Sequence, residues 1–151
     1  GEPDARALRR MHITDGFIRE VLRIHPPLNT LTRRVVNDIE YKGHLIEAGK
    51  NVMLCPYVAH RLESEFPEAE TIRPDRGQPT NPFALIPFGG GNRKCVGNAF
   101  AMLQVKMIFT VLLPAFEFEL AGPPETYAEV MPSLILRPAE PTLLKYRRRT
   151  A

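Results

Sequence analysis

Residues 88–97 bring together residue types that could do chemistry, in the order Phe-Gly-Gly-Gly-Asn-Arg-Lys-Cys-Val-Gly. Three consecutive glycines allow positive φ and let the backbone approach a flat or bulky group closely. Cys95 follows them and precedes a long apolar stretch that predicts a helix, whose positive end stabilises a thiolate. Arg93 adds a fixed positive charge. The segment therefore predicts that Cys95 is an anionic ligand or a nucleophile.

Two simpler interpretations of this segment compete with that prediction. A phosphate-binding loop would need the spacing Gly-x-Gly-x-x-Gly or a closing Lys-Ser/Thr pair, and the segment has neither. A free cysteine is most often a small buried hydrophobic side chain, but the adjacent Lys94 and nearby Arg93 disfavour burial. The second cysteine, Cys55, ends a strand-like run and fits a core position better. The four histidines show no metal-ligand spacing.

The composition fits one soluble globular domain with many irregular segments. The chain has 151 residues, 44% hydrophobic and 25% charged, and its 15 prolines are about twice the usual share. The net charge is only +3, and the run at 147–149 reads as a solvated basic tail. No motif predicts nucleic-acid binding. Two cysteines without a Cys-x-x-Cys pair favour a reducing compartment over a disulfide framework.

Hydrophobic periodicity predicts an α+β chain in which two helices flank short strands. The first helix is expected at 14–24, capped by Thr14 or Asp15 and ended by the prolines that follow His25. The second is expected at 96–113, as a buried core helix that stops at Pro114. Its central Gln104 and Lys106 argue against a membrane span, so no membrane segment is expected within this chain. Strands are predicted at 31–36, 39–41, 44–46, 51–54, 116–120, 134–136 and 143–146, with a short helix at 57–62 and an irregular stretch at 63–94.

The segment around Cys95 resembles the haem-binding signature of the cytochromes P450, Phe-x-x-Gly-x-Arg-x-Cys-x-Gly. Its fixed positions are occupied here by Phe88, Gly91, Arg93, Cys95 and Gly97. Two further motifs follow the family's order: Glu-x-x-Arg at residues 20–23 and Pro-x-Arg at residues 74–76. The chain departs from the family's meander at Gly77, where a Phe is common, and at Ile72, where an aromatic residue is common.

The resemblance covers essentially residues 1–151, as one C-terminal portion of a cytochrome P450 domain. It implies that this portion is α+β while the intact protein has the mostly α cytochrome P450 fold. The polar opening at residues 1–12 reads like a cut, so we expect a piece of a longer protein. The subfamily that it most resembles is the bacterial, sterol 14α-demethylase-like group.

The resemblance implies that Cys95 is the catalytic and metal-ligating residue, the axial thiolate of haem b (iron protoporphyrin IX). Phe88 would pack near the sulfur, and Gly91 and Gly97 would let the loop approach the porphyrin. Arg93 would pair with one haem propionate. Arg33 would pair with the other, with Arg34 as an alternative. A buried structural network would consist of Glu20, Arg23 and Arg76.

The implied activity is a haem-thiolate monooxygenase that inserts one oxygen atom from O2 into a small lipophilic substrate, such as a sterol or terpenoid. The residues implied to line the substrate pocket, with ordinary core as the alternative, are Leu28, Leu31, Leu134 and Ile135. Lys94 and Lys106 could dock an acidic ferredoxin or flavodoxin that is served by its reductase, with solvated surface as the alternative. A soluble, cytoplasmic bacterial protein is expected, and an anchor preceding this chain stays an alternative.

Three other readings stay open from the sequence. The first is a haem-binding fragment without turnover of its own, because the family's central helix and N-terminal haem-holding helix are not in these residues. The second is a related haem-thiolate chemistry, such as peroxide-driven oxidation or isomerisation. The third is a non-haem structural domain, which would need all three motif matches to be coincidental.

Overall fold

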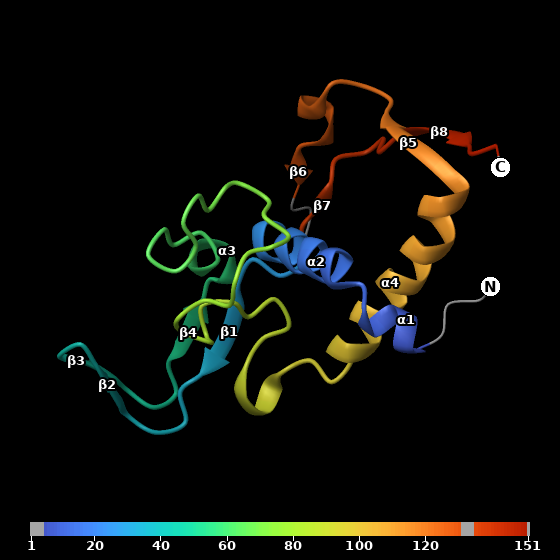
Figure 1. The fold of residues 1–151 in the computed structure, drawn as a ribbon. Helices are drawn as coiled ribbons and strands as arrows, with labels where there is room; N and C mark the ends of the chain where they lie inside the picture. Colours follow the sequence, from blue (N-terminus) through green and yellow to red (C-terminus); the bar gives the residue numbers. More distant parts are fainter. Residues whose placement is uncertain (1–4, 131–134, 151) are drawn as a thin grey trace.

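The computed structural model describes residues 5–130 and 135–150 of the chain. Helix α2 (His12–Ile24) lies at the centre, with the short strands and the long irregular segment on one side of it (Figure 1). Helix α4 (Asn98–Ala115) and the C-terminal strands lie on the other side (Figure 1). The mixture of helices and short strands is the α+β arrangement that the sequence predicts.

Helix α2 begins two residues before the predicted start, and no side chain caps it. Its N-cap is Met11, whose carbonyl accepts the N–H of Asp15 at 2.9 Å. Asp15 instead pairs with Arg19 and Lys106, so the predicted cap at Thr14 or Asp15 is wrong. At Gly16 an added Cβ would lie 1.8 Å from the Pro74 carbonyl oxygen, because the irregular segment packs directly on the helix backbone. A short helix that the sequence did not predict, α1 (Ala5–Arg9), precedes α2.

The strands after α2 form two separate two-stranded ladders rather than one sheet. Strand β1 (Leu31–Arg34) pairs antiparallel with β4 (Asn51–Leu54), and β2 (Ile39–Tyr41) pairs antiparallel with β3 (His44–Ile46). Lys42 and Gly43 join β2 to β3 with φ values of 50° and 78°, as a two-residue hairpin turn of the primed type requires. Helix α3 (Pro56–Ala59) follows, shorter than the predicted 57–62.

Residues 60–97 wind back over α2 with little regular structure apart from the 3-10 turn η1 (Gly91–Arg93). The small hydrophobic core lies here, where buried Phe66, Ala69 and Ala84 pack together with Leu85. The irregular stretch predicted at 63–94 is therefore a packed segment. It is fixed by its own core and by α2, and not by helices or strands of its own.

Helix α4 differs from its prediction in both position and environment. It runs through Pro114 to Ala115, since the proline occupies the last turn and the backbone becomes extended only at Phe116. None of its residues is buried within the described part of the chain, and Phe100 is 69% exposed. The prediction of a buried core helix is therefore wrong for this chain taken by itself. By length and composition α4 could also cross a membrane, with a mean hydropathy of 1.4.

The C-terminal strands return toward the end of α2. Strand β5 (Phe116–Leu120) pairs with β8 (Leu144–Arg148), and β6 (Glu129–Val130), after the 3-10 turn η2 (Pro124–Tyr127), pairs with β7 (Arg137–Pro138). The strand predicted at 134–136 lies partly outside the described residues. Its described part forms a single antiparallel bridge between Ile135 and Leu28 instead of a strand. This bridge joins the C-terminal region to the end of α2.

Candidate functional site

The loop that carries Cys95 is closed by its own backbone. The N–H of Cys95 donates to the Phe88 carbonyl at 2.9 Å, and the N–H of Gly89 donates to the Ile86 carbonyl at 2.9 Å. Cys95 is exposed and lies three residues before Asn98, the first residue of α4. Phe88 is half-buried and is held to the cysteine by that main-chain bond. The loop therefore presents a free thiol beside the positive end of an 18-residue helix.

Two glycines in the loop adopt backbone conformations that other residues rarely take. Gly89 has φ 73° and Gly91 has φ 64°, both in the left-handed region. A Cβ added at Gly91 would meet nothing within 4 Å, so this side of the loop is open. At Gly97 an added Cβ would lie 3.8 Å from the Cys95 sulfur. The loop and the helix start thus leave room around the sulfur for a large flat group.

Two arginines near the loop have no acidic partner in the described part of the chain. Arg93 is exposed in η1, and among the described residues it takes part in no ion pair. Arg33 makes only a local hydrogen bond of 2.9 Å to the Thr32 carbonyl. It shares a face of β1 with Leu31, while Arg34 points to the other face. Leu31 reaches the loop, since its methyl carbon would lie 3.9 Å from a Cβ on Gly89. Arg33, rather than Arg34, is thus on the strand face toward the loop.

Glu20, Arg23 and Arg76 lie together in one buried charged cluster, as the sequence predicts. Glu20 and Arg23 come from α2, and Arg76 comes from the irregular segment. Arg23 Nε donates to one carboxylate oxygen of Glu20 at 2.7 Å, and Arg23 Nη2 donates to the other at 3.0 Å. Arg76 Nε donates to Glu20 at 3.0 Å. Arg23 is completely buried and Glu20 nearly so. Such a buried charge group is tolerated only when each member is fully hydrogen-bonded.

Backbone carbonyls complete the hydrogen bonding of both arginines. Arg23 donates to the carbonyls of His60, Ala69 and Thr71. Arg76 donates to the carbonyls of Pro67, Glu68 and Thr71. Within the described residues no buried side-chain nitrogen or oxygen lacks a partner. The cluster therefore fixes the path of residues 60–76 around α2.

The cluster also keeps Glu20 ionised. Burial by itself would raise the pKa of Glu20, but hydrogen bonds from Arg23, from the Arg73 N–H and from Arg76 outweigh it. The net effect lowers the pKa of Glu20 below its ordinary value of 4.5. The carboxylate is thus charged at neutral pH and acts as a fixed acceptor, not as a proton donor.

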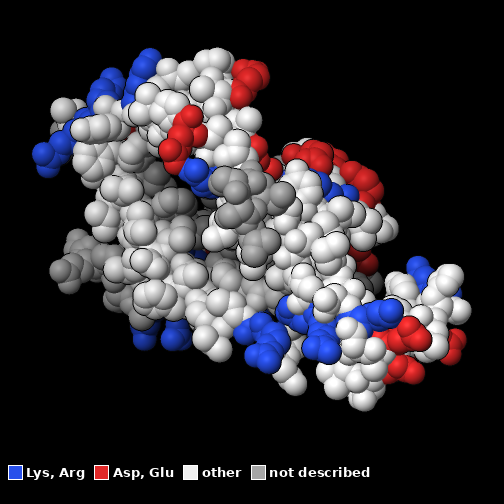
Figure 2. Space-filling model, turned by 180° about the vertical axis from the view of Figure 1, so that it is seen from behind, with Lys and Arg blue, Asp and Glu red and all other residues white. Residues whose placement is uncertain are grey.

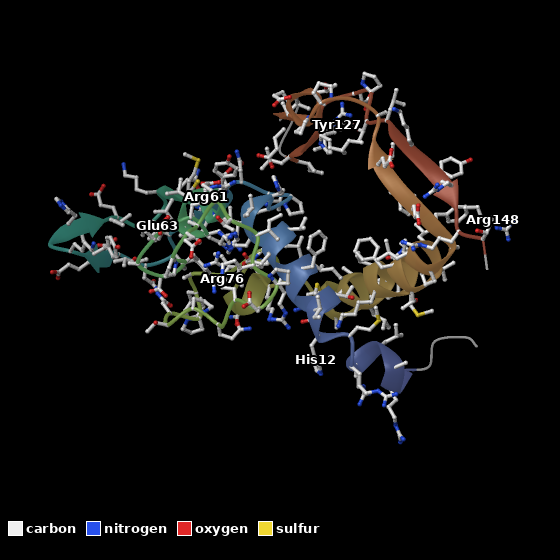
Figure 3. The ribbon with its side chains drawn as sticks, turned by 45° about the horizontal axis from the view of Figure 1, so that its top comes forward. His12, Arg61, Glu63, Arg76, Tyr127 and Arg148 are labelled. Atoms are coloured by element: carbon white, nitrogen blue, oxygen red, sulfur yellow. The ribbon has the colours of Figure 1, made fainter. Side chains whose placement is uncertain are left out.

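His60 and Arg61, which follow α3, add further contacts around the charged cluster. His60 is completely buried, its Nδ1 lies 3.1 Å from the Arg23 carbonyl, and its Nε2 accepts the N–H of Ile86 at 2.9 Å. Arg61 stacks on the Tyr57 ring and donates to the Ile24 carbonyl at 2.6 Å. Figure 3 shows Arg61 and Arg76 on the same side of the molecule, away from Tyr127 and Arg148 of the C-terminal region. The adjacent His-Arg pair in the sequence was the only available signal.

The residues expected to face substrate are brought together only in part. Leu28 and Ile135 form the isolated bridge, the N–H of Leu136 donates to the Pro27 carbonyl at 2.9 Å, and both bridge residues are exposed. Leu31 is half-buried beside the cysteine loop. Leu134 lies outside the described residues, so its role stays a prediction. His25 fastens the same junction, with its Nδ1 2.5 Å from a carboxylate oxygen of Glu129 in β6.

One of the two lysines assigned to partner docking is engaged elsewhere. Lys106 is mostly buried and pairs with Asp15 of α2. This contact fastens α4 to α2 and leaves the ammonium group unavailable to a partner, so the docking role predicted for Lys106 is wrong. Lys94 is exposed beside Cys95. It also lines a cavity of ≈ 430 Å³ between the loop, α2 and the start of α4, to which Cys95 does not contribute.

Comparison with known proteins agrees with this geometry. The cytochrome P450 family model matches residues 1–146. The chain belongs to the cytochrome P450 family. Sterol 14alpha-demethylase of Mycobacterium tuberculosis is 40% identical over 150 residues, which is 95% of this chain and 33% of the relative. Cytochrome P450 4d1 of Drosophila melanogaster is 36% identical over 148 residues, which is 94% of this chain and 29% of the relative.

A solved cytochrome P450 has the same arrangement of elements. The retinoic acid bound cyanobacterial CYP120A1 matches 96% of this chain with a TM-score of 0.85 and 31% identity, over 34% of its own length. The chain thus has the fold of part of a cytochrome P450, and it spans about a third of the length of these relatives.

Haem b is the cofactor of this family, and the residues present fit it. Cys95 is exposed just before a helix start, an added Cβ on Gly91 of its loop would meet nothing within 4 Å, and neither Arg93 nor Arg33 has an acidic partner among the described residues. The described residues contain no group of three or more His, Cys, Asp or Glu side chains that could hold a bare metal ion. A porphyrin, which supplies four nitrogen ligands itself and needs one axial ligand from the loop, suits this donor set.

Proposed function

We propose that the protein is a haem-thiolate monooxygenase in which Cys95 is the axial ligand of haem b. The observation that carries the proposal is the exposed Cys95 at the start of α4, on a loop whose glycines leave the sulfur accessible. When bound, haem supplies the chemistry that inserts one oxygen atom from O2 into a C–H bond, and a thiolate ligand pushes electron density toward O–O cleavage.

The residues around Cys95 hold and orient the cofactor. Phe88 would pack near the sulfur once haem is bound, and Gly91 and Gly97 would permit close approach of the loop. Arg93 and Arg33 bind the two propionates by charge-assisted hydrogen bonds, and their lack of acidic partners among the described residues supports this role. The contribution of Glu20, Arg23 and Arg76 is to position the chain, since their charges are fully engaged with one another.

The substrate we propose is a bulky lipophilic molecule such as a sterol or terpenoid. The support is the name of the mycobacterial relatives, sterol 14alpha-demethylase, at 38–40% identity. The residues proposed to contact this substrate are Leu28, Leu31, Leu134 and Ile135. The support for a shared role of Leu28 and Ile135 is the backbone bridge between them, beside which His25 contacts Glu129.

Electrons come from a ferredoxin or flavodoxin with its reductase, and exposed Lys94 is available for docking an acidic partner. In Figure 2, Lys and Arg side chains gather along the lower edge of the face in view and at its upper left corner, where β8 lies. We place the protein in the bacterial cytoplasm. Lys106, near the middle of α4, pairs with Asp15, which favours a helix packed in a folded protein over a membrane span.

The chain by itself is expected to lack turnover, because it spans about a third of its relatives. The experiment therefore uses the full-length, haem-loaded protein with a redox partner system, a panel of sterols and terpenoids, and isotopically labelled O2. We expect a product that carries one labelled oxygen atom, and none from the matched variant Cys95→Ser. Substrate conversion without label would favour peroxide-driven or isomerase chemistry. Equal labelling by the Cys95→Ser variant would overturn the role of Cys95.

A further inference from the structure

Arg23 and His60 bind each other's main chain. Arg23 Nη1 donates to the His60 carbonyl at 2.9 Å, and His60 Nδ1 lies 3.1 Å from the Arg23 carbonyl. Both side chains are completely buried. The two residues are 37 positions apart, so this reciprocal pair fixes the start of the irregular segment against the charged cluster of α2.

The other ring nitrogen of His60 reaches the cysteine loop. Nε2 accepts the N–H of Ile86 at 2.9 Å, and the Ile86 carbonyl accepts the N–H of Gly89 at 2.9 Å. Phe88, between them, accepts the N–H of Cys95 at 2.9 Å. A continuous path of short hydrogen bonds and covalent links therefore runs from the buried arginine to the residue that carries the thiol.

The ring can make both contacts in one protonation state only. A carbonyl can only accept and an N–H can only donate, so Nδ1 carries the hydrogen and Nε2 carries none. Burial, together with the charges of Arg23 and Arg61, lowers the pKa of His60 from 6.5 to about 4, against the hydrogen bond to the Arg23 carbonyl. His60 is thus a neutral ring whose orientation and tautomer are both fixed.

We infer that His60 is a positioning residue for Cys95. Its Nε2 anchors the N-terminal side of the cysteine loop to the cluster of Glu20, Arg23 and Arg76, so that the sulfur is held where the axial ligand is needed. This inference rests on the proposed function of Cys95 and adds to it a residue that acts through the loop. Replacing a residue that orients a metal ligand without touching the metal typically changes metal affinity or activity by about 10–100-fold.

The test compares two replacements of His60 in the full-length, haem-loaded protein. His60→Asn keeps a donor near Nδ1 but has no acceptor that reaches Ile86, whereas His60→Gln places an amide oxygen near Nε2. We expect His60→Asn to lose haem to a scavenger protein about tenfold faster and to shift the reduced carbon monoxide spectrum from the thiolate form toward the form without thiolate. His60→Gln should recover most of both properties.

A matched control separates positioning from general damage. Arg61→Ala removes a neighbour that also ties this segment to α2, through the Ile24 carbonyl, and within the described residues Arg61 makes no hydrogen bond or ion pair with the cysteine loop. Arg61→Ala should lower thermal stability without changing the thiolate spectrum. The inference is overturned if His60→Asn keeps a wild-type spectrum and haem retention, or if Arg61→Ala changes the spectrum as much. A wild-type protein without a thiolate spectrum would instead refute the proposed function itself.

Discussion

Two segments of the chain differ in how far their side chains are buried. The first runs from α2 to the cysteine loop, and the second runs from α4 to β8. In the first, polar and charged side chains are buried and hydrogen-bonded, as with the charged Arg23 and Glu20 and the neutral His60. In the second, no described residue is buried, and large apolar side chains such as Phe100 and Val111 face outward. Every buried residue among those described lies at or before Ala84.

This difference indicates which contacts around the proposed iron ligand, Cys95, are formed within the chain itself. The charged cluster is formed by α2 and the irregular segment alone, both of which lie within this chain. The apolar surface of α4 has no such partners in the described residues, and the chain spans about a third of its relatives. We therefore expect that further residues of the full-length protein cover α4, while the cysteine loop is held from behind by contacts already within this chain.

The largest expected effect comes from opening the charged cluster. In the full-length protein, Arg23→Ala leaves Glu20 with a poorly compensated buried charge and frees three backbone carbonyls. We expect it to lower the free energy of unfolding by about 3–5 kcal/mol, measured by urea denaturation. The control is Arg147→Ala, which breaks the exposed ion pair with Glu117 and should change nothing measurable. Equal effects of the two variants would remove the distinction between the two segments.

Acid should destabilise the protein through His60 of the first segment. The pKa of His60 is about 4 in the folded protein against 6.5 ordinarily, so the unfolded chain binds a proton first as the pH falls. The contribution of neutral His60 is complete above pH 6.5, declines toward pH 4, and amounts to roughly 3 kcal/mol in all. Denaturant unfolding across this range should show a shallower pH dependence in His60→Asn, and an unchanged slope would contradict the assignment.

Truncation of the small core should have a smaller effect. Phe66 is 1% exposed and lies under the Arg23 guanidinium, whose central carbon is 5.3 Å from the ring centroid. Phe66→Leu should cost about 1–2 kcal/mol of unfolding free energy, because it leaves a partial void and removes the ring beneath the cation. The matched change is Phe118→Leu in β5, where the ring is 40% exposed. It should cost clearly less unfolding free energy when both variants are compared by thermal unfolding.

The smallest effect concerns the junction between the two segments. His25 and Glu129 are partly exposed, so Glu129→Gln should reduce stability by at most about 1 kcal/mol. Substrate affinity should fall more noticeably, because the pair holds the side that carries Ile135 against Leu28. Spectral titration with a lipophilic substrate measures the dissociation constant. An unchanged dissociation constant would show that the contact between His25 and Glu129 has no role in substrate binding.

The sequence predicted the elements near the site better than the contacts that hold them. The spacing of Glu20 and Arg23 on a helix, and the turn at Lys42 and Gly43, follow from local rules, and the structure shows both. The second contact of His60 depends on the N–H of Ile86, 26 residues away, which no residue type reveals.

The errors about α4 have a similar cause. An apolar helix reads as core, yet its burial depends on which other elements are present, and none of its residues is buried in the described part of the chain. The docking role predicted for Lys106 follows from its positive charge on the cysteine side. Its partner, Asp15, lies 91 positions away on another helix, so the sequence does not reveal the pair. Side-chain pairing across the fold is a property of tertiary packing, which periodicity does not encode.

We propose that Cys95 binds haem iron as a thiolate. The most direct measurement is the carbon monoxide difference spectrum of the reduced, full-length, haem-loaded protein, recorded beside the Cys95→Ser variant. We expect a Soret band at about 450 nm in the wild-type protein and its loss in the variant. A wild-type band displaced well to the blue in folded protein, or the same band in both proteins, would contradict ligation by the Cys95 thiolate.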